Sequence, residues 1–137
     1  MTTKNILSVF DTEAMCEDGE WLHLVVPGTG ERAYADLEKK KPLRIKLKGP
    51  ESDTWTTFFR KARQAACEKD SRTNDEVKLS DSRLMARMTL AVENIPGVDK
   101  SDKESIVSMY RNYQDIRSQA LDFISNRENF IVKPVAD

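Results

Sequence analysis

The chain has 137 residues, a size typical of one domain, and its 33% charged residues leave a net charge of −1. Because the charges nearly cancel, no global field would attract the protein to nucleic acid or to an anionic membrane, so we expect partners to be recognised locally. The longest apolar runs, such as residues 24–26, are far shorter than the roughly 20 residues of a membrane helix. The first residues also lack the apolar core of a secretion signal, so we expect no export.

Residues 1–19 are acidic and mixed in character, and we expect this lead-in to be partly mobile. It contains one apolar cluster that could dock on the body of the protein, formed by Ile6, Leu7, Val9 and Phe10. Residues 20–26 are rich in β-branched and aromatic side chains and predict a strand that ends at a glycine-containing turn. Residues 43–48 predict a second strand, because aliphatic and cationic side chains alternate strictly before Gly49.

Four helices are predicted in the rest of the chain, because apolar residues recur there at threes and fours, over residues 52–69, 80–92, 101–111 and 113–126. The first helix begins at Ser52 or Asp53 and the second at Ser80 or Asp81, with a polar loop over residues 70–78 between them. The third begins at Ser101, because the spacing of Ser101, Asp102, Lys103 and Glu104 has the form of a capping box.

Together these elements predict an α+β fold, in which a small N-terminal antiparallel β-hairpin or sheet is followed by a bundle of about four α-helices. We expect one domain over residues 20–130 and a frayed tail over residues 131–137.

The turn at residues 28–33, GTGERA, fits the loose G-x-G-x-x-A pattern of a dinucleotide-binding loop. Such a loop needs a helix at the second glycine, and Glu31 would place a carboxylate beside the phosphates. A turn between strands is favoured, since glycine adopts a positive φ without steric cost. We therefore expect no dinucleotide and no other cofactor.

Residues 39–48, KKKPLRIKLK, contain six cations in ten positions and could contact phosphates. No aromatic residues alternate with the cations, as binding to single strands would require. Lysines on the exposed face of a strand also protect the edge of a sheet from aggregation, which is the favoured interpretation. Binding of an acidic partner protein is a third use, for which Lys46 and Lys48 are the candidate residues.

Four aromatic residues near the end of the chain are candidates for contacts with another protein, namely Tyr110, Tyr113, Phe123 and Phe130. Their helical spacing favours the core for most of them. A small helical end can nevertheless leave part of such a stripe exposed for a partner.

The residues that could support catalysis or metal binding are few. Cys16 and Cys67 belong to no Cys-x-x-Cys or Cys/His cluster, which argues against zinc and a disulfide framework. His23 is the only histidine, and no sequence feature places it near Cys67. Carboxylates such as Asp99 and Asp102 lack the spacing of a calcium loop. We therefore expect no metal, no catalytic residue and no enzymatic activity.

Several short motifs occur in a distinctive order: WLHL at 21–24, PGTGE at 27–31, KPLRIKL at 41–47, GPESDTW at 49–55, and an aromatic ending from Tyr110 that closes with NRENF at 126–130. This order resembles the tail assembly chaperones of long-tailed bacteriophages. In that family a strand, a P-x-TG turn, a second strand and a G-P/S-x-S-D helix start precede a similar aromatic ending. Many relatives carry a tryptophan in the segment where this chain has VENIPG at 92–97.

The resemblance implies a non-enzymatic phage or prophage protein that binds the tape measure protein, keeps it soluble and promotes tail tube assembly around it. It also implies a longer version, made by ribosomal frameshifting, that adds a domain for the tail tube protein. The expected location is the host bacterial cytoplasm, and the protein is not expected in the mature virion.

Such a chaperone would cover the apolar stripes of a helical partner, and many copies would be needed along it. Self-association into rings or spirals is therefore expected, with the lysine-faced strand opposite the acidic lead-in as one complementary pair. Two alternatives remain open. One is another non-enzymatic phage tail-completion or neck protein, and the other is a small nucleic-acid-binding regulator that uses residues 39–48.

Overall fold

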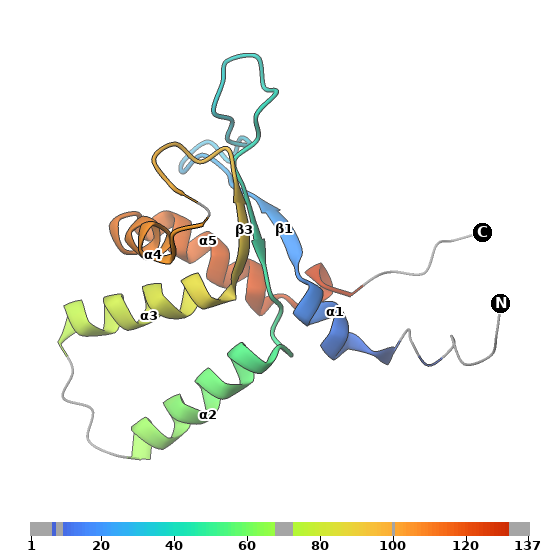
Figure 1. Cartoon of the computed structure of the whole chain (residues 1–137), viewed down its shortest axis with the longest axis vertical. Coiled ribbons are helices and arrows are strands. Elements are labelled where there is room, and N and C mark those ends of the chain that lie inside the picture. Colours follow the sequence, from blue (N-terminus) through green and yellow to red (C-terminus); the bar gives the residue numbers. More distant parts are fainter. Residues whose placement is uncertain (1–6, 8–9, 68–72, 100, 132–137) are drawn as a thin grey trace.

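The computed structural model describes residues 7, 10–67, 73–99 and 101–131. Within these ranges the chain forms a three-stranded antiparallel sheet surrounded by helices (Figure 1). The elements are α1 (Thr12–Asp18), β1 (Glu20–His23), β2 (Arg44–Leu47), α2 (Asp53–Cys67), α3 (Asn74–Met88), β3 (Thr89–Glu93), α4 (Lys103–Asn112), α5 (Gln114–Ser125) and the 3-10 helix η2 (Arg127–Asn129). The predicted α+β class is confirmed.

Strand β2 lies in the middle of the sheet, between β1 and β3. Its residues Ile45 and Leu47 are fully buried, whereas Arg44 and Lys46, which alternate with them, are half-buried. The alternation in the sequence therefore produced one core-facing side, as expected for a strand. Because β2 is central, its cations do not protect a sheet edge, and that explanation of the lysines was wrong.

The third strand replaces the end of a predicted helix. Helix α3 ends at Met88, and Thr89–Glu93 form β3, although residues 80–92 were predicted to be helical. The backbone of β3 pairs with β2, which places Val92 opposite Ile45 in the core. Pairing with a distant strand overrode the local helical spacing of the apolar residues.

Helix α3 begins earlier than predicted. Its N-cap is Thr73, whose hydroxyl accepts a hydrogen bond from the Glu76 N–H at 3.2 Å, so the expected starts at Ser80 and Asp81 were wrong. Residues 74–78, which were predicted to be loop, form the first turns of this helix.

The remaining boundaries differ by a few residues. Strand β1 ends at His23, and only an isolated bridge between Val25 and Arg32 continues the predicted run to residue 26. Helix α4 has Asp102 as its N-cap, because the Asp102 carboxylate accepts from the Glu104 N–H at 3.1 Å. The Ser101 hydroxyl instead donates to Asp99, so the predicted capping box does not form. Helix α2 is described to residue 67, and positions 68 and 69 of the prediction lie outside the described residues.

Part of the predicted mobile lead-in is helical. Asp11 caps α1 by accepting a hydrogen bond from the Ala14 N–H, and Cys16 is fully buried. The predicted docking of the apolar cluster was wrong for Leu7 and Phe10, which are 72% and 74% exposed. Ile6 and Val9 lie outside the described residues.

Helix α1 holds the start of helix α2 through one side chain. Glu17 accepts a hydrogen bond from the Asp53 N–H at 2.6 Å and forms an ion pair with Lys48 at 3.5 Å. The expected N-cap at Ser52 is buried, and its hydroxyl donates to the sulfur of Met88 at 3.9 Å. A carboxylate from another helix therefore satisfies the first backbone donor of α2.

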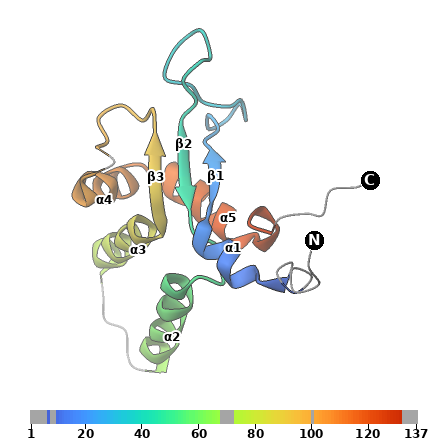
Figure 2. The ribbon, with the colours of Figure 1, turned by 45° about the vertical axis from the view of Figure 1, so that its right-hand side comes forward.

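The core lies between the sheet and helices α3, α4 and α5, which pack together on one side of it (Figure 2). The largest fully buried side chains there are Tyr110, Ile45, Leu47, Met85, Met88 and Ile124. Helix α2 points away from the sheet in both views and faces α3. None of the helices in the described part of the chain combines the length and apolarity that crossing a membrane requires.

A side chain covers the free edge of the sheet just beyond β1. The Val25 N–H donates to Oε1 of Gln119 on α5, and Nε2 of Gln119 donates to the Val25 carbonyl, both at 2.9 Å. Nε2 of Gln119 also donates to Asp115 at 2.5 Å. The amide therefore occupies both backbone groups that an added strand would use at this position.

Candidate protein-binding groove

Tyr110, one of the residues proposed to bind a partner, lies in the core. It is fully buried, and its hydroxyl lies 2.7 Å from the hydroxyl of Thr89. The Thr89 hydroxyl donates to the Met85 carbonyl at 2.7 Å, so Tyr110 must be the donor to Thr89. Burial raises the pKa of the Tyr110 phenol. In this conformation Tyr110 joins α4 to the start of β3.

Phe123 and Phe130 form a second pair. Their rings meet edge to face with centroids 5.3 Å apart, and Phe130 is buried while Phe123 is half-buried. The amide of Asn129 donates to the Phe123 carbonyl at 2.9 Å and so holds η2 against the end of α5. These two aromatic residues anchor the NRENF segment to the core.

Tyr113 is the aromatic candidate that lies on the surface, 61% exposed, at the junction of α4 and α5. Tyr110 and Tyr113 are only three positions apart, yet one is buried and the other exposed. The structure does not bring Tyr113 together with the other three aromatic candidates.

The cations of residues 39–48 are divided between a turn and the sheet. The carboxylate of Asp36 accepts hydrogen bonds from the backbone N–H groups of Lys40 and Lys41, which fixes the turn before β2. Lys48 pairs with Glu17, whereas Lys46, which lies opposite Trp21, makes no ion pair with a described residue. The run therefore does not form one continuous basic stripe.

Arg44 on the same strand is occupied by two neighbours. Its guanidinium lies 2.6 Å from the carboxylate of Glu93 on β3 and 4.5 Å from the ring centroid of Trp21 on β1. The cation–π contact and the ion pair link all three strands through one side chain.

The glycine-rich turn has the geometry expected of a connection between strands. Gly28 and Gly30 have φ values of 88° and 72°, and no helix begins at Gly30. Nε2 of His23 donates to the Ala33 carbonyl at 2.8 Å, so the imidazole helps to hold the segment that follows this turn.

Cys16 is a buried thiol next to Glu51, and burial raises its pKa, as an unreactive thiol would show. Among the residues that the structure describes, no three His, Cys, Asp or Glu side chains come together as a metal site would require.

A groove of about 770 Å³ lies between α2 and α3, where the two helices diverge (Figure 1). Three apolar side chains line it, Phe58 from α2 and Leu79 and Leu84 from α3. Polar and charged residues surround them, namely Asp53, Thr54, Thr57, Lys61, Glu76, Ser80, Asp81, Arg83 and Arg87. This volume is within the range of roughly 300–1,000 Å³ that binding pockets usually have.

The apolar surface continues from the groove along α2. The rings of Trp55, Phe58 and Phe59 contact one another, with the Trp55 and Phe59 centroids 4.9 Å apart. Trp55 is buried, whereas Phe59 is 46% exposed. Exposed aromatic rings next to an apolar groove are typical of surfaces that bind other proteins.

The groove could not be predicted from the sequence, because its two walls are separate helices, and the residue spacing within either helix does not determine how the two are placed. Local signals were nevertheless present. Phe58 and Phe59 are adjacent, so they cannot both face the same core. Arg83 and Arg87 are four positions apart and therefore lie on the same side of α3.

Comparison with known protein families, with curated proteins and with solved structures found no match to this chain.

Proposed function

We propose that the protein is a phage tail assembly chaperone that binds the long, helical tape measure protein, keeps it soluble and promotes assembly of the tail tube around it. The structural observation that carries the proposal is the groove between α2 and α3, with its apolar floor and the exposed ring of Phe59 beside it. An amphipathic helix can place its apolar face in such a groove.

A tape measure protein is expected to carry apolar helical stripes that lack partners until the tube forms. A protein that covers these stripes stabilises the soluble form of its partner by mass action. The order of sequence motifs from Trp21 to Phe130 supports the same proposal. The proposal includes contacts with the tail tube protein, made through a longer frameshifted version. It also includes the host cytoplasm as the place where the chaperone acts.

Self-association into rings or spirals is also proposed, but two of the charges that the sequence suggested for it already pair within one chain. Lys48 and Glu17 are 3.5 Å apart within one chain, so these two charges already neutralise each other. A contact between copies would have to use other residues, such as the exposed Tyr113.

The proposal is tested by co-expressing this chain with the tape measure protein of the same phage or prophage. We expect the tape measure protein to move from the insoluble to the soluble fraction and to co-purify with the chain. A control co-expression uses an unrelated aggregation-prone protein rich in β-strands, which should remain insoluble. If the tape measure protein stays insoluble although this chain is folded by circular dichroism, the proposed function is wrong.

A further inference from the structure

We infer that the groove between α2 and α3 selects an amphipathic helix whose apolar stripe is bordered by acidic side chains. The inference rests on the proposed function in taking a helical segment of a partner protein as the occupant. It adds the location of the binding surface and the charge pattern that this surface recognises.

The floor of the groove is apolar. Phe58, Leu79 and Leu84 come from two different helices and form an apolar surface that both walls share. Burial of apolar area contributes roughly 25 cal/mol per Å², so large aliphatic or aromatic side chains on an incoming helix are favoured there. Anchors spaced by three or four residues would enter the groove from one face of that helix.

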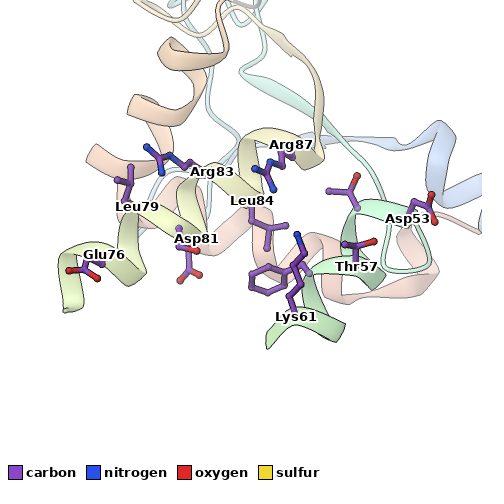
Figure 3. A pocket seen from close by; sticks show the side chains of 12 residues that line it. Asp53, Thr57, Lys61, Glu76, Leu79, Asp81, Arg83, Leu84 and Arg87 are labelled. Atoms are coloured by element: carbon purple, nitrogen blue, oxygen red, sulfur yellow. The ribbon is translucent and has the colours of Figure 1, made fainter. Parts of the chain in front are cut away.

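Three cations line the groove. Lys61 on α2 and Arg83 and Arg87 on α3 make no ion pair with any residue that the structure describes. Figure 3 shows Lys61 and Arg87 extending toward one another from the two walls, with Leu84 between them. Water screens these charges in the free protein, but a helix that covers the groove would remove much of that water.

An occupant with carboxylates beside Lys61 and Arg87 would replace the lost water as their partner. An occupant with lysines there would place its positive charges next to those of the groove. Charge complementarity of this kind discriminates between partners more than it adds to affinity. The acidic residues of the lining do not cancel this preference, because Asp53 and Glu76 lie at the two ends of the groove in Figure 3. Asp81 on α3 is the exception, because Figure 3 shows it pointing from α3 toward α2, whereas Arg83 lies on the far side of α3. The preference for carboxylates therefore rests on Lys61 and Arg87, the two cations that extend toward one another from the two walls.

The occupant is a partner protein rather than a second copy of this chain. The apolar faces of α4 and α5 are already buried through residues such as Ile106, Tyr110 and Ile124. Helix α3 likewise has apolar residues buried in the core, such as Met85 and Met88. A second copy could therefore offer the buried apolar faces of these three helices only by unfolding part of its own core.

The test uses three fluorescein-labelled helical peptides that share one apolar stripe and carry glutamate, glutamine or lysine beside it. We expect the glutamate peptide to bind the wild-type protein about ten-fold more tightly than the lysine peptide, as two partly exposed ion pairs would give. The variant Lys61→Glu/Arg87→Glu should reverse this order. The matched control, Lys41→Glu/Lys103→Glu, changes the net charge equally at exposed positions outside the groove and should keep the wild-type order.

Equal affinities for the glutamate and lysine peptides, or an unchanged order in the Lys61→Glu/Arg87→Glu variant, would overturn the inference. Tighter binding of a labelled DNA duplex than of the glutamate peptide would also overturn the inference, if Lys61→Glu/Arg87→Glu abolished the DNA binding. The cations would then bind nucleic acid. A change of oligomeric state caused by that variant in analytical ultracentrifugation would assign the groove to a second copy.

The inference and the proposed function fail in different ways. If the tape measure protein becomes equally soluble with the wild type and with Lys61→Glu/Arg87→Glu, the function stands and the groove is not its site. If the peptides bind as expected but the tape measure protein stays insoluble, the groove binds acidic amphipathic helices and the proposed function is wrong.

Discussion

Gly49 and Phe130 are packed so closely that a single added carbon would bring them into conflict. A Cβ built on Gly49 would lie 2.7 Å from Cγ of Phe130 and 2.6 Å from the sulfur of Cys16. The glycine that ends β2 is therefore required by the aromatic residue that closes the NRENF segment and by the buried thiol of α1. Two motifs that are far apart in the sequence form one interlocked contact.

The variant Gly49→Ala should lower the free energy of unfolding by roughly 1–3 kcal/mol, because overpacking at this site forces Phe130 or Cys16 to move. Urea denaturation followed by circular dichroism measures the change. A double variant with Phe130→Ala should lose less stability than the sum of the two single variants, because the smaller side chain removes the clash. Strict additivity would show that Gly49 and Phe130 do not interact.

Glu51 gives the protein an acid-sensitive contact. Hydrogen bonds from Thr12 and then Arg127 hold the pKa of its carboxyl below the ordinary value of 4.5, and Arg127 lies 3.1 Å away. The unfolded chain then binds the proton more tightly, so this contribution to stability is present above about pH 4.5 and is lost as the pH falls through the folded-state pKa.

The variant Glu51→Gln should therefore show a smaller loss of stability than the wild type on acidification from about pH 5 to pH 3. Urea midpoints at several pH values measure this difference, which is modest because the carboxylate is partly exposed. Glu128→Gln, which changes an exposed carboxyl of η2, is the control. An identical acid response of the wild type and Glu51→Gln would contradict the assignment.

Tyr110→Phe should cost roughly 0.5–1.5 kcal/mol of stability at neutral pH, because the half-buried Thr89 hydroxyl loses its donor. The variant should also change how the stability of the protein depends on alkaline pH. The folded-state pKa of Tyr110 lies above its ordinary value of 10.0, so the stability of the wild type falls as the pH rises above about 10, when the unfolded chain ionises first.

Chemical denaturation between about pH 7 and pH 11 tests both effects, since Tyr110→Phe removes an ionisation that folding suppresses. Tyr113→Phe, at the exposed tyrosine, is the matched control and should behave as the wild type does. An alkaline loss of stability that is equally steep in Tyr110→Phe would exclude Tyr110 as its source.

Gln119→Glu should destabilise the protein by roughly 1 kcal/mol or more, because a carboxylate accepts from the Val25 N–H but cannot donate to the Val25 carbonyl. It would also lie next to the Asp115 carboxylate, which now accepts from Gln119. Gln114→Glu, at an exposed position of the same helix, is the control. In thermal unfolding, Gln119→Glu should have a lower melting temperature than Gln114→Glu. Equal melting temperatures would show that the Gln119 side chain does not stabilise the contact with Val25.

The sequence predicted those elements whose pattern is local. Strand β2 has strict alternation within six residues, and the later helices keep apolar residues at threes and fours, so each could be identified without knowledge of the others. Strand β3 could not, because Leu84, Met88, Ala91 and Val92 also fit a helix. Its pairing depends on β2, and Arg44 and Glu93 are 49 positions apart.

The candidate site was predicted less well for the same physical reason. Spacing places Tyr110 and Tyr113 near each other on the chain, but it does not say which of them faces the core once α4 ends and α5 begins. Lys46 and Lys48 were predicted to contact an acidic partner protein, whereas the position of α1 determines that Lys48 is paired with Glu17. The groove depends on the angle between α2 and α3, which neither helix specifies alone.

The contact between Gln119 and Val25 has a consequence for a protein that is proposed to work at high local concentration along a partner. A glutamine amide has the same hydrogen-bond donor and acceptor as one peptide unit. The Gln119 side chain therefore takes the place that the backbone of an added strand would have at Val25. Crowded copies are thereby denied a template for cross-β stacking at this position of the sheet edge.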